Sequence, residues 1–284
     1  MVDVDVIDIW VNLFTRPGIE AYNDSDAREA ALLFNREEMY ALGTEQTPTE
    51  FVEEMDAAGV EQCFIPAFKV GDPDGDVDID IDYETVQGVV DEYPDRFKGL
   101  AGINPHTGME GVWALEEAVE DHDFVGAHLH PHGFERPINH REFYPFYAKC
   151  AELDVPVLMQ VGHSAEFMPN RMGKPLHLDD VALDFPEVDF VACHLGWPWT
   201  KEMEAIAWKH PNVYVGTTAH APKYWEEHMV NFMRTRGQDK VLFGTDFPVL
   251  SFDEAIGQIE DDLDFPESVQ RKLFRENAEK IFDI

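Results

Sequence analysis

Several histidines and one aspartate stand where apolar segments of the sequence end. They are His130, His132, His163, His194 and Asp246. An imidazole changes its charge near neutral pH and a carboxylate accepts protons, so their convergence is typical of an acid–base or metal site. Each residue alone also has a structural explanation, because Asp commonly caps a helix or a turn. Their repeated position after apolar segments favours the chemical interpretation.

The segment Lys240–Thr245 shows how the chain would present such a residue. Its apolar run is typical of a buried parallel strand, which ends in Gly244 and Thr245 before the carboxylate of Asp246. Pro248 then stops further strand pairing. In a barrel of parallel strands, the carboxyl ends carry the active site. Asp246 is therefore the first candidate for chemistry.

Apolar segments of strand length alternate with helical segments along the chain. The predicted strands are Val4–Trp10, Val60–Pro66, Phe97–Ile103, Phe124–His130, Val155–Val161, Val188–His194, Val213–Thr217 and Lys240–Thr245. The predicted helices cover residues 26–42, 48–59, 83–93, 109–121, 142–153, 176–184, 201–209, 222–236, 252–262 and 266–282. This alternation predicts an α/β fold with a parallel sheet, and eight such units match a (β/α)8 TIM barrel.

The chain is predicted to form a single domain over residues 1–284. Residues 11–45 would be an insertion after the first strand, and residues 266–284 a C-terminal helix. A doubly wound open sheet is the alternative fold, but it requires a glycine-rich turn after the first strand. The sequence there is Trp-Val-Asn-Leu, residues 10–13. One helix start is well marked, because residues 47–50 read Thr-Pro-Thr-Glu, a capping box with an early proline.

The charge of the chain limits its partners. The sequence has 57 acidic and 21 basic residues, a formal net charge of −36. This charge argues against nucleic acids and anionic membranes, which are polyanions. Acidic residues spread over the whole length predict a surface adapted to very high salt, as in an extreme halophile. The acidic start is not a signal peptide, and three cysteines without CxxC spacing fit a cytoplasmic protein.

Other residues at predicted strand ends could bind a small-molecule substrate. They are Trp10, Asn12, His128, Gln160, Trp197 and Trp199. The two amides would offer neutral hydrogen bonds, and the two later tryptophans an aromatic wall over the pocket. The first histidine would bind an anionic group when protonated, or else point into the barrel core. Loop arginines are weaker candidates for holding a substrate carboxylate, because surface arginines usually pair locally; they are Arg136, Arg141 and Arg171.

Six segments carry a resemblance to a known family. They are residues 126–131, 156–162, 190–199, 212–215, 242–248 and 276–282. They resemble the amidohydrolase superfamily, in the branch that contains aminocarboxymuconate-semialdehyde decarboxylase, and the resemblance spans nearly the whole chain. It implies a TIM-barrel enzyme that acts on a small organic substrate by hydrolysis or carbon–carbon cleavage. It also implies one divalent metal, usually zinc, and the homodimers that are common in the family.

Most of the metal ligands that the resemblance implies are substituted in this chain. The family pattern places His-x-His at the end of the first strand, where Trp10 and Asn12 stand, and a histidine on the fifth strand, where Gln160 stands. Only the eighth-strand Asp246 and the sixth-strand His194, which binds or polarises the substrate in the family, match the pattern. Indole and amide groups are poor zinc ligands.

Three hypotheses follow for the site. In the first, the enzyme works without metal, with Asp246 as general base and His194 as an acid or an anchor for the developing oxyanion. In the second, a relocated zinc site forms from His130, His163, His194 and Asp246. In the third, catalysis is lost and the barrel mouth only binds a small molecule. The leading prediction is a hydrolase of a carboxylic acid, lactone or amide; a non-oxidative decarboxylase is the alternative.

Overall fold

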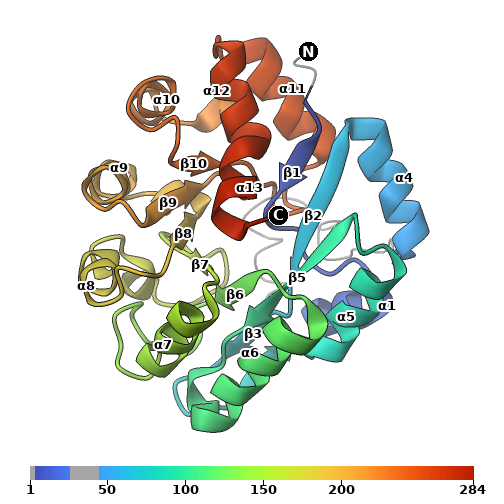
Figure 1. Cartoon of the computed structure of the whole chain (residues 1–284), viewed down its shortest axis with the longest axis vertical. Helices are drawn as coiled ribbons and strands as arrows, with labels where there is room; N and C mark the ends of the chain where they lie inside the picture. Colours follow the sequence, from blue (N-terminus) through green and yellow to red (C-terminus); the bar gives the residue numbers. More distant parts are fainter. Residues whose placement is uncertain (1–3, 26–44) are drawn as a thin grey trace.

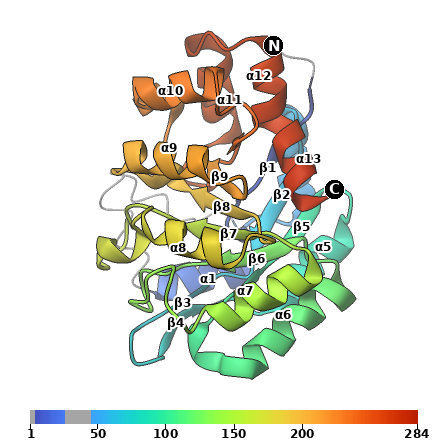
Figure 2. The same cartoon turned by 60° about the vertical axis from the view of Figure 1, so that its left-hand side comes forward.

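The computed structural model describes residues 4–25 and 45–284. In this part of the chain, eight parallel strands form one sheet in the order β1-β2-β5-β6-β7-β8-β9-β10. Their bounds are β1 Val6–Asp8, β2 Val60–Pro66, β5 Phe97–Gly102, β6 Gly126–Leu129, β7 Val157–Gln160, β8 Phe190–Cys193, β9 Val213–Gly216 and β10 Val241–Leu242. Helices surround the strands on the outside (Figures 1 and 2), so the predicted (β/α)8 barrel is confirmed.

All described α-helices except α1 (Arg16–Asp24), which was not predicted, agree closely with predicted ones. They are α4 Pro48–Ala58, α5 Tyr83–Glu92, α6 Gly108–His122, α7 Tyr144–Leu153, α8 His177–Asp184, α9 Thr200–Lys209, α10 Glu227–Arg234, α11 Phe252–Asp262, α12 Glu267–Arg271 and α13 Asn277–Phe282. A π-helical turn, Lys272–Glu276, joins the last two into the predicted C-terminal helix. The helix predicted over residues 26–42 lies outside the described residues. Within the described ranges, every helix is too short or too polar to span a bilayer.

The strands of the barrel are short and fully covered. Every residue of β6, β7, β8 and β9 is buried. A parallel strand has one face on the barrel interior and the other under the helices, so continuous apolar runs bury both faces. The three cysteines are buried and unpaired within this core, as expected for reduced residues.

The seam between the first and last strands is closed by both backbone and side-chain hydrogen bonds. The backbone N–H of Ile9 donates to the carbonyl of Phe243 at 3.2 Å, and that of Asp246 donates to the carbonyl of Trp10 at 2.9 Å. Between these two bonds, the side chain of Asp8 accepts the backbone N–H and the hydroxyl of Thr245 at 3.1 and 2.6 Å. A buried carboxyl group therefore occupies the place of a backbone acceptor at the seam.

One hairpin lies outside the predicted strands and helices. The Gly/Asp-rich segment 71–82 takes part in an antiparallel hairpin of β3 (Lys69–Gly71) and β4 (Val77–Asp80). Val70 pairs with Ile79 and both side chains are buried, while the aspartates between them face outward. The alternation Val-Asp-Ile-Asp is the two-residue period of a half-buried strand. The many aspartates of the segment concealed this pattern.

The predicted capping box at the start of α4 is present. The Thr47 hydroxyl accepts the Glu50 backbone N–H at 3.3 Å, and the Glu50 carboxylate accepts the Thr47 backbone N–H at 2.8 Å. Thr47→Ala is expected to lower the free energy of unfolding by about 1 kcal/mol, because it leaves a helix N–H without its acceptor. Chemical denaturation at fixed salt measures the change. Thr47→Ser keeps the acceptor, and a similar loss in that variant would contradict the capping explanation.

Candidate active site

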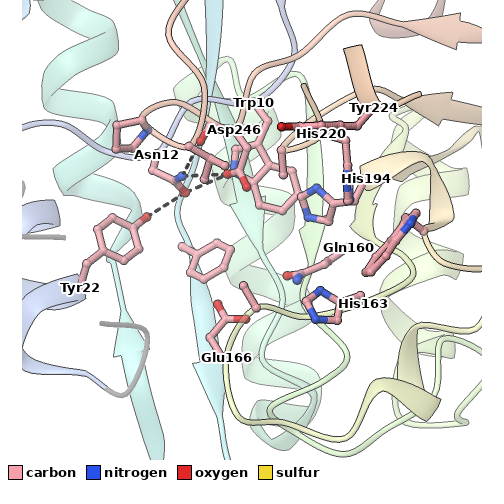
Figure 3. A pocket seen from close by; sticks show the side chains of 16 residues that line it. Trp10, Asn12, Tyr22, Gln160, His163, Glu166, His194, His220, Tyr224 and Asp246 are labelled. Atoms are coloured by element: carbon pink, nitrogen blue, oxygen red, sulfur yellow. Dashed lines mark hydrogen bonds between the residues drawn. The ribbon is translucent and has the colours of Figure 1, made fainter. Parts of the chain in front are cut away.

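The carboxyl ends of the barrel strands surround a pocket of about 420 Å³. Its described lining residues are Trp10, Asn12, Tyr22, Phe68, Gln160, His163, Ala165, Glu166, His194, Trp197, Ala219, His220, Tyr224, Asp246, Pro248 and Val249 (Figure 3). They come from the loops after β1, β2, β7, β8, β9 and β10, which is the end of the barrel where catalytic residues are built. The pocket therefore lies where the sequence placed the site.

Asp246 and Asn12 meet across the seam at the pocket wall. Asn12 Nδ2 donates to Asp246 Oδ1 at 2.8 Å. Asn12 Oδ1 accepts the indole N–H of Trp10 at 3.2 Å and the hydroxyl of Tyr22 at 3.4 Å (Figure 3). Since an indole N–H can only donate, the Asn12 oxygen must face Trp10 and its N–H must face the carboxylate. Asn12 thus orients Asp246, although the sequence suggested a substrate contact.

The surroundings of Asp246 favour its protonated form. Burial raises its pKa well above the usual value, and the negative charges of Glu166 and Asp8 raise it further. The hydrogen bond from Asn12 acts in the opposite direction, because it stabilises the carboxylate. The Asp246 side chain is a lining residue of the pocket, so the group is within reach of a ligand. A carboxyl group with a raised pKa is a candidate for proton transfer at a higher pH than an ordinary aspartate.

His194 lies across the pocket from this pair with one ring nitrogen already engaged. Its Nδ1 is 2.8 Å from the hydroxyl of Thr218 and 3.3 Å from the carbonyl of the same residue. Burial lowers the pKa of His194 well below the usual value, with a further contribution from His220. The imidazole is therefore neutral at pH 7, and Nε2 is the nitrogen left free for the pocket.

The remaining predicted residues at the mouth fall on one side of the pocket. His163 lines it with its ring edge-to-face against Trp197, at a centroid distance of 5.4 Å. Trp197 is partly exposed and its ring also lies 5.6 Å from that of His220. Gln160, at the end of β7, is a buried lining residue. The structure thus brings these predicted side chains together with His194 and Asp246.

Three lining residues after consecutive strands have left-handed backbone. His194, Ala219 and Asp246 follow β8, β9 and β10 with φ of 61°, 65° and 56°. A positive φ is uncommon outside glycine, and such residues cluster at functional sites where the surrounding structure holds them. The same strained conformation at three strand ends turns these residues toward one pocket.

Trp10 fills the centre of the site. Its ring is buried and packs edge-to-face on His128 at 4.5 Å and tilted against His194 at 5.1 Å. His128 lies behind this indole rather than in the pocket wall, so its predicted role in substrate binding was wrong and its alternative place in the barrel core was right. An indole and the Asn12 amide replace imidazole donors here, so the residues present do not fit the metal that the resemblance implied.

The structure does not assemble the relocated metal site either. His130 is fully buried beside Phe68 and does not line the pocket that contains His163, His194 and Asp246. Among the described residues, no three His, Cys, Asp or Glu side chains are arranged to hold a metal ion. The Nε2 atom of His130 lies 4.0 Å from the Glu166 carboxylate. The prediction of His130 as a catalytic or ligand residue is therefore contradicted by its position.

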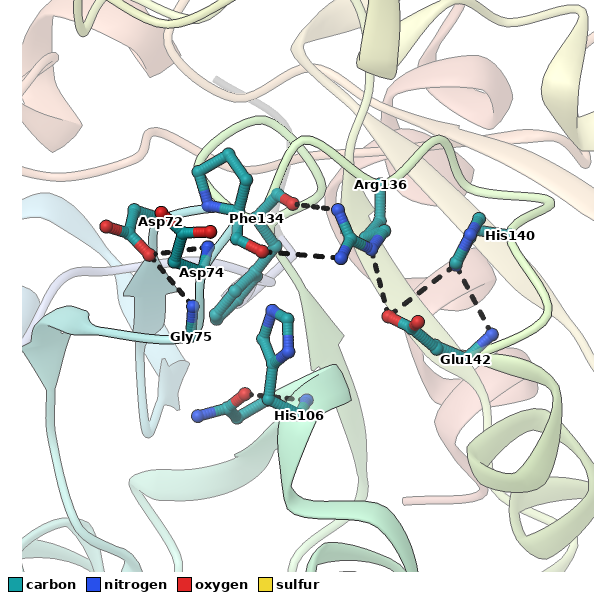
Figure 4. Close-up of polar contacts among 10 residues, drawn as sticks. Asp72, Asp74, Gly75, His106, Phe134, Arg136, His140 and Glu142 are labelled. Atoms are coloured by element: carbon teal, nitrogen blue, oxygen red, sulfur yellow. Dashed lines mark hydrogen bonds and ion pairs between the residues drawn. The ribbon is translucent and has the colours of Figure 1, made fainter.

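Two further predictions at the mouth were wrong. Trp199 points away from the pocket, with the Lys174 ammonium 5.4 Å from its ring centroid. Arg136 donates to Glu142 at 2.9 Å and to the carbonyl of Phe134, outside the pocket near the tip of the β3–β4 hairpin (Figure 4). The loop arginines Arg141 and Arg171 are also absent from the lining. Arg136 and Arg171 pair locally, with Glu142 and Glu135, as surface arginines in an acidic protein commonly do.

Several lining residues were missed by sequence reasoning. They are Tyr22, Phe68, Glu166, His220 and Tyr224. Glu166 and His220 stand within six residues of the ends of β7 and β9, so a longer search after each strand would have included them. Tyr22 belongs to α1 (Arg16–Asp24), inside the insertion after β1, where no local pattern pointed to the pocket.

The match to a family model establishes the class of protein. The Amidohydro_2 model, described as amidohydrolase, matches residues 17–284, so the chain belongs to this family. An uncharacterized TIM-barrel protein from Bordetella bronchiseptica has the same fold, with a TM-score of 0.80, 24% identity and 99% of both chains covered.

Two characterised proteins are also similar. A 5-carboxyvanillate decarboxylase from Novosphingobium aromaticivorans, solved with manganese and a nitrobenzoic acid, matches with a TM-score of 0.75 and 18% identity, over 99% of this chain and 97% of that one. A 2-keto-4-carboxy-3-hexenedioate hydratase from Sphingobium is 32% identical over 127 residues, 38% of this chain. The matched segment spans 37% of the length of that hydratase.

Proposed function

We propose that the protein is a hydrolase of a small lactone or amide, with Asp246 as general base. The observation that carries the proposal is the pairing of Asp246 with Asn12 inside a pocket faced by a neutral His194. One carboxylate oxygen is held by the amide, so the other can take a proton from an attacking water. General-base catalysis of this kind requires a fixed carboxylate whose pKa is close to the working pH.

His194 would stabilise the charge that develops on the substrate carbonyl. The hydroxyl of Thr218 accepts the backbone N–H of His194 at 3.0 Å and lies 2.8 Å from Nδ1, so it can donate its own proton to Nδ1. In that tautomer the ring proton lies on Nε2, where it can donate to an oxyanion. The buried aromatic floor of Trp10 keeps bulk water from this side of the pocket. In the complex, Asp246 would pass the abstracted proton to the leaving group.

A lyase reaction is the second candidate. The raised pKa of Asp246 means that this group also carries a proton to donate, as protonation of a substrate carbon in decarboxylation or hydration requires. The similarity to a hydratase and to decarboxylases supports this candidate at least as well as hydrolysis. Because the manganese of that decarboxylase finds no matching donor set here, no step through a metal is proposed.

A panel of substrates distinguishes the candidates. Lactones and esters are tested for acid release by pH-stat, amides for release of the free amine, and aromatic acids for CO2 release, with the Asp246→Asn protein as the blank. Hydrolysis predicts a release of acid or amine that the blank lacks. CO2 release, or addition of water to a double bond, would replace the hydrolase with the lyase. Ligand binding without turnover anywhere in the panel would leave a binding protein.

A further inference from the structure

The pocket carries acidic groups without a compensating cation. Glu166 and Asp246 both line it, and neither Lys nor Arg does among the residues that the structure describes. The two carboxyl groups sense each other, since the charge of Glu166 raises the pKa of Asp246. Because the surroundings favour the protonated form of Asp246, the Glu166 carboxylate, whose side chain is only 11% exposed, is the charge that lacks a cation. A partly buried charge is normally paired, so a cationic ligand could supply the missing partner.

The histidines of the pocket do not supply positive charge. Burial lowers the pKa of His220 to about 4, and it also lowers the pKa of His163 and of His194. All three imidazoles are therefore neutral at pH 7. A substrate carboxylate in this pocket would meet neutral rings and two acids.

Two described loop cations are engaged outside the pocket. Lys223 pairs with Glu254 at 3.4 Å, and Arg171 pairs with Glu135. Neither contributes to the lining. The local charge of the pocket therefore has the same sign as the −36 charge of the whole chain.

The walls of the pocket are rich in aromatic faces. They are contributed by Trp10, Tyr22, Phe68, Trp197 and Tyr224. Aromatic faces attract cations, most strongly where water is excluded, and carboxylates beside them add direct attraction. Figure 3 shows Glu166 pointing into the space between Tyr22 and His163, opposite Asp246.

We propose that the pocket recognises a small molecule, about the size of one substituted aromatic ring, that bears an organic cation such as an amine or amidine. It would bind a carboxylate of the same shape less tightly. We assign the recognition of this charge to Glu166, because the hydroxyl of Ser164 donates to its carboxylate and holds it at the pocket edge. The inference concerns the substrate class of the proposed hydrolase and rests on that pocket. A lactone or amide that carries a basic nitrogen would satisfy both the proposed reaction and the proposed preference for a cation.

Three ligands of nearly the same shape test the proposal. Benzamidine, benzamide and benzoate differ chiefly in charge, and their binding is measured by calorimetry on the whole protein at pH 8. A salt concentration above 1 M keeps the Debye length near 3 Å or below, so the overall charge of the protein is screened. Benzamidine is expected to bind at least tenfold more tightly than benzoate, with benzamide between them. Equal or tighter binding of benzoate would overturn the proposal.

Variants separate the role of Glu166 from general effects. Glu166→Gln keeps the size of the side chain and is expected to reduce the benzamidine-to-benzoate affinity ratio at least threefold, while benzamide binding stays the same. Glu135→Gln, outside the pocket, is the matched control and should leave the ratio unchanged. An unchanged ratio in Glu166→Gln would refute the assignment of Glu166. Because these are binding measurements, a failed turnover assay would count against the hydrolase without deciding the ligand charge.

Discussion

Replacing Asp246 with asparagine is expected to lower kcat/KM by about 10²–10⁴-fold, the usual range for loss of a general acid or base. Asparagine keeps the shape of the side chain, but it cannot accept a proton from water. Ligand affinity is measured in parallel. Retained binding would show that the variant is folded and that the loss falls on kcat. A variant with more than a tenth of the wild-type kcat/KM would show that another group is the base.

The pH dependence of the wild-type enzyme gives the direction of the proton transfer. As a general base, Asp246 must be ionised, so kcat/KM should fall as the pH drops through its pKa. Burial and the charges of Glu166 and Asp8 raise that pKa well above 3.8. The acid limb of the profile is therefore expected well above pH 4. A lyase that uses the protonated group would show the opposite limb, with activity lost as the pH rises.

Asn12→Ala is the positioning control for this prediction. The Asn12 hydrogen bond lowers the pKa of Asp246, so its removal should move the acid limb to higher pH as well as reduce the rate. A purely structural loss would reduce the rate without moving the limb. The pH profile therefore separates the two explanations.

The second large effect is expected at Asp8, on stability rather than on activity. This carboxyl group is fully buried at the barrel seam, and burial raises its pKa to about 7 against the opposing hydrogen bonds of Thr245 and Trp10. The folded state then holds a proton that the unfolded state releases above about pH 4. Each pH unit of this difference changes the free energy of unfolding by about 1.4 kcal/mol. Stability is thus lost as the pH rises from 4 to 7, by about 4 kcal/mol from this group.

Asp8→Asn removes that titration while it keeps an oxygen for the two backbone N–H groups. Denaturation of the wild type and the variant is compared at pH 4 to 8 and constant salt. The difference, variant minus wild type, should become more favourable to the variant with rising pH and level off above pH 7. A difference that does not change with pH would mean that Asp8 is ionised throughout. The variant difference also cancels the contributions of acids that do not interact with Asp8, whereas Asp246 is coupled to it.

Much of the barrel could be predicted because each strand carries its own signal. Apolar runs such as Val188–His194 must be buried on both faces, and Val60–Pro66 was predicted with the bounds of β2. The predicted strands generally ran one to three residues past the observed ladders. The final residue of one prediction, His194, leaves the hydrogen-bonded ladder and lines the pocket.

The site was harder to predict because strand ends do not reveal which side chains face the pocket. His128 lies near the end of β6 and His130 follows it, as good candidates would, yet both rings are buried against Phe68 and neither lines the pocket. Trp199 lies outside the pocket lining because it stands just before α9. Tyr22 depends on how an insertion returns to the barrel, which no local pattern encodes. Orientation is a tertiary property, whereas position in the chain is a local one.

The contact that defines the site also sets when it can form. The hydrogen bond from Asn12 to Asp246 joins residues 234 positions apart in the sequence. Contacts of such long range form late, because the loop between their partners must first be closed. During synthesis, Trp10 and Asn12 leave the ribosome long before β10 exists. The barrel seam can therefore close only after the last strand has been synthesised. The pocket forms at the end of folding.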